Sequence, residues 1–182
     1  MGKRQVLLVV DMVHDFVYGV LGNEYARMII PRIKELIDKA RENGVPVVYL
    51  RDCHRLSDPE IKHWGTHSMK GEEGSKVIPE LAPRDDETVI PKTTYSGFFR
   101  TPLEAILEGI GAEKMVLVGV STHICVLHNA AESFFRGYKV QVVEDATAAF
   151  NLQEHEKALK YMREIYGAEV LKTEDIIKVW EA

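Results

Sequence analysis

Short apolar runs alternate with amphipathic stretches along the whole chain of 182 residues, and this alternation restricts the fold more than any other feature. The apolar runs are rich in β-branched residues and too short for helices, so they indicate buried strands. Because fully buried strands joined by helices form parallel sheets, the pattern predicts a three-layer α/β/α sandwich with a mainly parallel sheet of Rossmann-like topology. The predicted strands are residues 5–10, 45–50, 88–90, 115–120 and 140–143, with a weaker sixth at 168–171.

The stretches between these strands carry the signals of helix ends. Thr101 and Asn151 each precede a glutamate by three residues, which is typical of a helix N-terminus, and Pro102 suits a first helical position. No repeat or linker interrupts the chain, so residues 1–182 are predicted to form one domain. The predicted helices are residues 28–43, 102–109, 124–136, 152–166 and one that starts at 173.

Composition excludes several classes of partner. The net charge of −5 and the lack of a basic segment argue against binding to nucleic acid or to anionic membranes. Residues 1–3 are too short for the charged lead of a signal peptide, and the apolar run at 6–10 is too short for its core, so we expect a cytoplasmic protein. Two cysteines, Cys53 and Cys125, do not make a disulfide framework, and we expect free thiols.

Polar residues follow the predicted strands directly, at the edge of the sheet where ligands bind. Cys125 lies where a strand turns into a helix, so backbone N–H groups and the helix dipole are expected to stabilise a thiolate and an oxyanion. Asp11 is placed to exchange a proton with it, and Lys92 to keep Asp11 ionised. Taken singly, each residue is more typical of a structural or surface role; their coincidence at one edge indicates a nucleophilic site.

A second group of polar residues surrounds the end of the second strand. Asp52 and His54 lie on one side of an extended segment, and a third ligand from the following loop, His63 or His67, would complete a metal site. From the spacing alone, an equally good interpretation is that these histidines lie on the surface and bind no metal. The loop itself, residues 53–84, contains no clear strand, and loops of that length are usually functional.

His128 offers a rival arrangement for the nucleophile, because it follows Cys125 by about one helical turn. A Cys–His pair is a known way to activate a thiol. We favour the alternative, in which His128 is a hydrogen-bonded residue on the flank of the helix.

Three segments, VVDMVHDF (9–16), PKTTYSGF (91–98) and GVSTHICV (119–126), together resemble the isochorismatase-like cysteine hydrolases. Within that family the chain is most similar to nicotinamidases. The resemblance implies a catalytic triad of Asp11, Lys92 and Cys125. It also implies a cis peptide bond between Val120 and Ser121, and an oxyanion hole formed by the N–H groups of Ser121 and Cys125.

The same resemblance extends to the second group. It implies a divalent metal, zinc or a similar ion, held by Asp52 and His54, with His67 favoured over His63 as the third ligand. In the family this metal holds the pyridine nitrogen of the substrate, and aromatic residues sandwich its ring. The family also tends to form homodimers or homotetramers. The chain departs from many members at Val13, where they have glutamine. The candidates for the aromatic role are Phe16, Trp64 and Tyr95.

The function that the resemblance implies is hydrolysis of the carboxamide of nicotinamide to nicotinic acid and ammonia through a thioester. One alternative is another amidase of the family that acts on a carbamoyl or ureido group. A second is vinyl-ether hydrolysis, which Cys125 disfavours because some of those enzymes lack the cysteine. A third is a member that binds a small molecule without catalysis.

Overall fold

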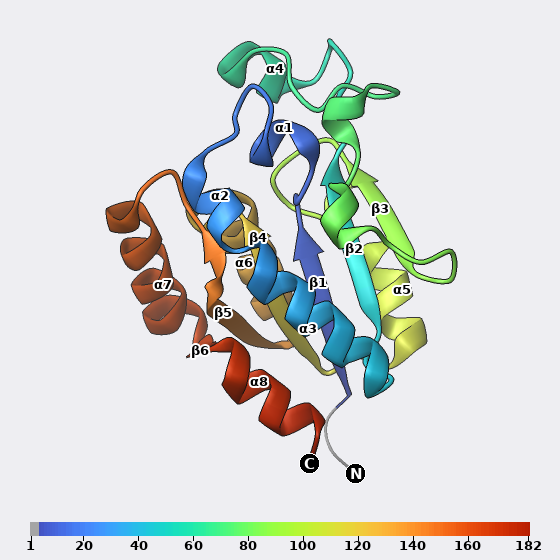
Figure 1. The fold of residues 1–182 in the computed structure, drawn as a ribbon, viewed down its shortest axis with the longest axis vertical. Helices are drawn as coiled ribbons and strands as arrows, with labels where there is room; N and C mark the ends of the chain where they lie inside the picture. The colour runs from blue at the N-terminus through green and yellow to red at the C-terminus, as the bar shows by residue number, and fades with distance from the viewer. Residues whose placement is uncertain (1–3) are drawn as a thin grey trace.

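Six parallel strands form one sheet in the order β3-β2-β1-β4-β5-β6 (Figure 1), which confirms the predicted fold class. The computed structural model describes residues 4–182, so the judgement on residues 1–3 lies outside it. Every pair of neighbouring strands is parallel, whereas the sequence predicted a mainly parallel sheet. The strands are β1 (Gln5–Val10), β2 (Val47–Asp52), β3 (Thr88–Lys92), β4 (Lys114–Val120), β5 (Lys139–Ala148) and β6 (Glu169–Leu171).

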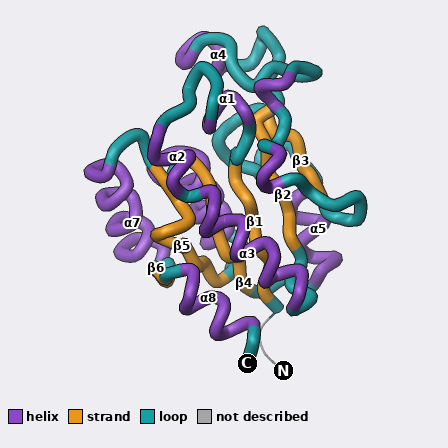
Figure 2. Tube along the Cα trace, in the orientation of Figure 1, coloured by secondary structure: helices purple, strands orange, loops and turns teal. Residues whose placement is uncertain are grey.

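Helices cover both faces of the sheet (Figure 2). In β1, Leu7 and Val9 face one helical layer while Val6 and Leu8 face the other, and all four are fully buried. Burial on both faces explains why the strands read as continuous apolar runs. One layer contains α2 (Glu24–Met28), α3 (Ile30–Glu42) and α8 (Thr173–Trp180); the other contains α5 (Leu103–Ile110), α6 (Leu127–Phe135) and α7 (Leu152–Tyr166).

Three predicted helix starts differ from the structure. The helix expected from residue 28 begins at Ile30, because Met28 ends the separate short helix α2, which Asn23 caps. The helix expected from residue 124 begins at Leu127, after a π-helical turn, η3 (Thr122–Val126). The helix expected from residue 102 begins at Leu103, with Pro102 as its N-cap, and Glu104 pairs with Arg136 at 3.1 Å.

The long segment after β2 contains no strand, as predicted. Its first part, residues 53–75, lies beyond the carboxyl ends of the strands near α1 (His14–Val17) (Figure 1), and its last part runs back past α3, where Ile78 and Leu81 join the core. Asp15 of α1 holds this segment, because its Oδ2 accepts a hydrogen bond from Ser68 N at 2.7 Å. Within residues 4–182, no helix is long and apolar enough to cross a membrane. The segment contains α4 (Pro59–Trp64) and two 3-10 turns, η1 (Glu73–Ser75) and η2 (Pro79–Leu81).

The order of the strands reverses between β1 and β4, and the crevice at that point is where ligands bind in such sheets. Gly119 near the end of β4 is required there. Its φ is 111°, and a Cβ atom would lie 2.0 Å from the carbonyl oxygen of Val10. Only glycine therefore allows the two strand ends to approach this closely.

Substitution of Gly119 by alanine is expected to lower the free energy of unfolding by about 3 kcal/mol, from backbone strain and the backbone clash together. Gly109→Ala is the control, because Gly109 is an exposed residue of α5 with open space at its Cβ position. That change is expected to stabilise the protein by about 0.5–1 kcal/mol. Denaturant unfolding measures both, and equal effects would contradict this account of Gly119.

Candidate active site

A buried lysine between two carboxylates forms the centre of the candidate site. The Nζ atom of Lys92 lies 2.7 Å from Asp11 Oδ2, donates a short hydrogen bond to Asp52 Oδ1, and lies 3.7 Å from Cys125 Sγ. All four residues are at most 5% exposed. The structure therefore brings together the three residues predicted to form a triad, and it adds Asp52 to them.

The sheet itself places these groups. Asp52 and Lys92 are paired in register at the ends of β2 and β3, and Asp11 follows the adjacent β1. The backbone N–H of Asp52 donates to Asp11 Oδ1 at 2.8 Å, which fixes that carboxylate. Asp11 has a φ of 51°, a strained conformation that aspartate tolerates better than most residues.

Burial dominates the ionisation of this group. The pKa of Asp11 is raised to about 7, because burial and the charge of Asp52 outweigh Lys92. Burial also raises the pKa of the Cys125 thiol well above its ordinary value. Lys92 does lower the pKa of Asp11, as expected, but burial and Asp52 outweigh it. The expectation of a thiolate at rest differs from the structure, because burial of Cys125 outweighs the charge of Lys92. Near neutral pH the proton resides on Cys125, and Asp11 is poised to accept it.

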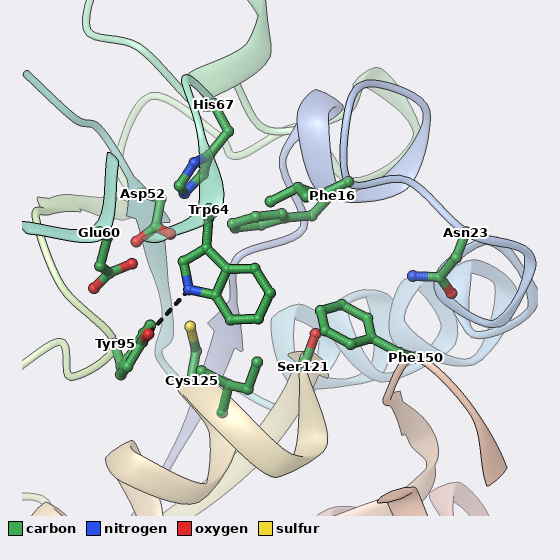
Figure 3. A pocket seen from close by; sticks show the side chains of 12 residues that line it. Phe16, Asn23, Asp52, Glu60, Trp64, His67, Tyr95, Ser121, Cys125 and Phe150 are labelled. Carbon is green, nitrogen blue, oxygen red and sulfur yellow. Dashed lines mark hydrogen bonds between the residues drawn. The ribbon is translucent and has the colours of Figure 1, made fainter. Parts of the chain in front are cut away.

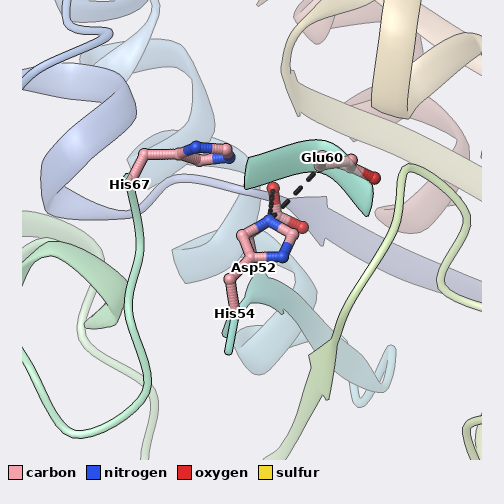
Figure 4. Close-up of side chains that lie close together, drawn as sticks. All are labelled: Asp52, His54, Glu60 and His67. Carbon is pink, nitrogen blue, oxygen red and sulfur yellow. Dashed lines mark ion pairs between the residues drawn. The ribbon is translucent and has the colours of Figure 1, made fainter. Parts of the chain in front are cut away.

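A four-residue group of possible metal ligands lies beside the lysine (Figure 4). One ligand atom from each of Asp52, His54, Glu60 and His67 lies within 4.8 Å of the others, and all four residues are buried. Asp52 Oδ2 and His54 Nε2 lie 3.4 Å apart, but neither they nor Glu60 Oε1 have a hydrogen-bond partner in the described part of the chain. Because buried polar atoms without hydrogen bonds are costly, this donor set fits a bound cation. Carboxylate and imidazole ligands suit zinc, iron and manganese.

Of the two histidines considered as the third ligand, the structure places His67, and not His63, in this group. His67 lies in it, and its Nδ1 donates to the carbonyl of Gly65 at 2.8 Å, which leaves the other ring nitrogen free. His63 is exposed and packs on the edge of Trp64, with ring centroids 4.8 Å apart. Glu60, in the first turn of α4, was not predicted, because a glutamate in a charged segment gives no signal of its own.

The cavity above Cys125 is partly open to solvent and has aromatic walls (Figure 3). Phe16, Trp64 and Tyr95, the aromatic residues predicted from the sequence, all line it, and Trp64 Nε1 donates to the hydroxyl of Tyr95 at 3.0 Å. Val13 is fully buried and does not line it. The sequence did not identify four further lining residues, Leu21, Asn23, Ile124 and Phe150.

The loop that carries Cys125 is held from two sides. Asn129 donates to the carbonyl of Cys125 at 2.8 Å and accepts from Gly97 N at 2.8 Å, so α6 is tied to the segment after Lys92. On the other side, Thr122 Oγ1 lies 2.8 Å from His155 Nδ1 of α7. Neither support was predicted, since both depend on contacts between distant segments.

Two details of this loop bear on earlier expectations. The peptide bond between Val120 and Ser121 is cis, as the resemblance implied, and Ser121 lines the cavity beside Cys125. His128 is exposed on α6, and its Nδ1 donates to the carbonyl of Ile124 at 2.7 Å. This is the flanking position that we favoured over a Cys–His pair.

The fold and this group of residues define a class: a doubly wound parallel α/β protein with a buried Asp–Lys–Cys cluster where the strand order reverses. Residues 5–175 match the isochorismatase domain, and the chain belongs to the isochorismatase family of hydrolases. It is 29% identical to the uncharacterized isochorismatase family protein YaaI of Bacillus subtilis, over 96% of this chain and 97% of that protein. It is 33% identical to enterobactin synthase component B of Escherichia coli, over 96% of this chain but 63% of that protein.

Solved structures of amidases share the fold. N-carbamoylsarcosine amidase from Thermoplasma acidophilum is 41% identical, with a TM-score of 0.89 over 94% of this chain and 97% of that one. Nicotinamidase PncA from Bacillus subtilis is 31% identical, with a TM-score of 0.89 over 93% and 100%. Pyrazinamidase of Pyrococcus horikoshii in complex with zinc is 29% identical, with a TM-score of 0.86 over 93% and 99%.

Lys92→Met is expected to lower the free energy of unfolding by about 3–5 kcal/mol at pH 8, because it leaves two buried carboxylates without a counter-charge. Loss of the ammonium raises the folded-state pKa of both carboxyls, Asp11 from its already raised value and Asp52 from its lowered one. The folded state is then penalised at pH values above the pKa of an unfolded carboxyl. The loss should shrink as the pH falls from 8 to 5 and the carboxyls become protonated in the folded protein.

Urea unfolding of chelator-treated protein at the two pH values measures this effect. Lys34→Met is the control, since Lys34 forms an exposed pair with Asp38 and should cost within about 0.5 kcal/mol at either pH. A Lys92→Met deficit that does not change with pH would contradict the ion-pair explanation.

Proposed function

We propose that this protein is a metal-containing cysteine amidohydrolase that converts nicotinamide, or a closely similar neutral heteroaromatic carboxamide, to the acid and ammonia. The observation that carries the proposal is the contact of the buried Lys92 with Asp11, Asp52 and Cys125, of which Asp52 and Cys125 line an aromatic cavity. The likeness to nicotinamidase PncA of Bacillus subtilis supports this choice of substrate.

The chemistry starts from the protonated thiol. Cys125 Sγ attacks the amide carbon and passes its proton to Asp11, whose raised pKa of about 7 makes it a suitable base near neutral pH. The N–H groups of Ser121 and Cys125 stabilise the oxyanion. The C–N bond then breaks, ammonia leaves with the proton from Asp11, and a thioester remains. Water, deprotonated by Asp11, attacks the thioester and releases the acid and the thiol.

Lys92 supports each of these steps without exchanging a proton itself. Burial disfavours its ammonium, but the negative charges of Asp11 and Asp52 outweigh burial and raise the pKa of Lys92, so it stays charged throughout. It holds Asp11 in place at 2.7 Å and partly offsets the negative charge that develops on Cys125.

The metal in this proposal is zinc, held by Asp52, His54, Glu60 and His67. Asp52 has a separate oxygen for each role, because Oδ1 binds Lys92 while Oδ2 has no hydrogen-bond partner within residues 4–182. When bound, the ion supplies a Lewis-acid site that holds a ring nitrogen of the substrate beside the aromatic walls. The zinc complex of the Pyrococcus horikoshii pyrazinamidase supports this choice of ion.

Hydrolysis of a carbamoyl amino acid is the second candidate, and its support is the 41% identity to the N-carbamoylsarcosine amidase of Thermoplasma acidophilum. Such a substrate carries a carboxylate. None of the described residues that line the cavity is lysine or arginine, whereas Asp52 and Glu60 both line it. The cavity side chains therefore favour a neutral aromatic amide over an anionic one.

Cys125→Ala is expected to reduce ammonia release from nicotinamide by at least about 10⁴-fold, because the thioester route needs the thiol. Cys53→Ala is the matched control: Cys53 is also a buried free cysteine, but it does not line the cavity. It should keep wild-type turnover. A Cys125→Ala enzyme with wild-type activity would falsify the proposal.

Glu60→Gln is expected to weaken zinc binding by about 10–100-fold or more, because it removes a carboxylate from the donor set. His63→Gln, a change of the exposed histidine nearby, should leave zinc affinity unaltered. Competition with a chromophoric chelator measures both. The proposed ligand set is wrong if the two variants bind zinc equally well.

A further inference from the structure

Asn23 is a polar residue at the outer end of the cavity, away from the metal ligands. It lies on the opposite side from Asp52, Glu60 and Tyr95 (Figure 3). The neighbouring walls are apolar, formed by Leu21, Phe16 and Phe150. A single polar side chain in such surroundings is well placed to fix the orientation of a ligand.

The orientation of the Asn23 amide is set by the helix that follows it. Asn23 is the N-cap of α2, and its Oδ1 accepts a hydrogen bond from Ala26 N at 3.0 Å. The oxygen is thereby used, and Nδ2 must point the other way. Asn23 is half-buried, and Figure 3 shows this nitrogen directed toward the cavity. The cavity therefore presents a hydrogen-bond donor at this position, rather than an acceptor.

The segment that carries Asn23 is tightly held, so the donor has a fixed position. Leu21 N donates to Asp15 O at 2.9 Å, and Gly22 N donates to Gly19 O at 2.9 Å. A Cβ atom on Gly22 would lie 2.7 Å from the carbonyl oxygen of Val17, so the chain folds back closely onto α1. A donor held in this way loses little conformational freedom when a ligand binds.

We infer that Asn23 is a specificity-determining residue, whose Nδ2 binds a neutral hydrogen-bond acceptor on the substrate at the end remote from the amide that is cleaved. This inference rests on the proposed function, and it narrows the substrate class to ring-substituted carboxamides that carry an ether, carbonyl or similar oxygen. A neutral acceptor suits this position better than a carboxylate, because the described lining residues include no lysine or arginine.

The test compares pairs of substrates that match in size, namely 5-methoxynicotinamide with 5-ethylnicotinamide, and the corresponding 6-substituted pair. The wild-type enzyme is expected to prefer the methoxy compound in kcat/KM by about 3–10-fold at one of the two ring positions, the usual effect of one hydrogen bond. Asn23→Asp keeps the shape and the helix cap but replaces the donor by an acceptor. In that variant the preference should vanish or reverse.

Asn151→Asp is the matched control, because Asn151 caps α7 in the same manner, accepting from Glu154 N at 2.9 Å, and does not line the cavity. Its methoxy-to-ethyl ratio should equal that of the wild type. Asn23→Ser keeps a side chain that can cap α2 but removes the amide NH₂ group, so this variant should also lose the preference for the methoxy compound. A wild-type ratio near one at both positions, or a ratio that Asn23→Asp leaves unchanged, overturns the inference while the proposed function stands.

The proposed function itself fails if the wild-type enzyme hydrolyses none of the carboxamides, and this outcome is distinct from the ones above. The inference is then judged by binding of the same compounds to the wild type and to Asn23→Asp, measured by calorimetry. Tighter binding of a methoxy compound that disappears in Asn23→Asp supports it. Equal affinities, or no binding at all, overturn it.

Discussion

The ion-pair network around Lys92 is the interaction on which the rest of the site depends. One ammonium, 1% exposed, contacts carboxylates that come from the ends of two adjacent strands. Each carboxylate alone would be expensive to bury, and the lysine makes their presence possible. The network also fixes the division of tasks: Asp11 faces the thiol, while Asp52 faces both the lysine and the possible metal ligands. In the proposed mechanism, a change at Asp52 would therefore affect proton transfer and metal binding together.

Much of this arrangement could be predicted from the sequence because it follows from the topology of a parallel sheet. Residues that directly follow parallel strands must meet at one edge, so Asp11, Lys92 and Cys125 could be grouped before their contacts were known. The strands were also predictable, because burial on both faces leaves a local apolar signal. The N-cap at Asn151 was predictable for the same reason, since a cap and its helix are adjacent in sequence.

The parts that were not predicted depend on how distant segments pack. Glu60 becomes a possible ligand only because α4 folds back over the end of β2, and Phe150 reaches the cavity only from the end of β5. The ionisation of Cys125 was predicted wrongly for a related reason. A strand-to-helix turn suggests a stabilised anion, but complete burial opposes it, and burial depends on the whole fold.

Asp15 links two parts of the cavity that are far apart in sequence. It immediately precedes Phe16 on one wall, and its carboxylate binds Ser68, the residue after His67. The wall that selects the substrate and a possible metal ligand are thus held by a single side chain. During evolution, the aromatic wall and the position of His67 could therefore hardly change independently. An insertion or deletion between α4 and η1 that reshaped the aromatic wall would also displace His67. Divergence of substrate range on this scaffold is therefore expected to go together with gain or loss of the metal.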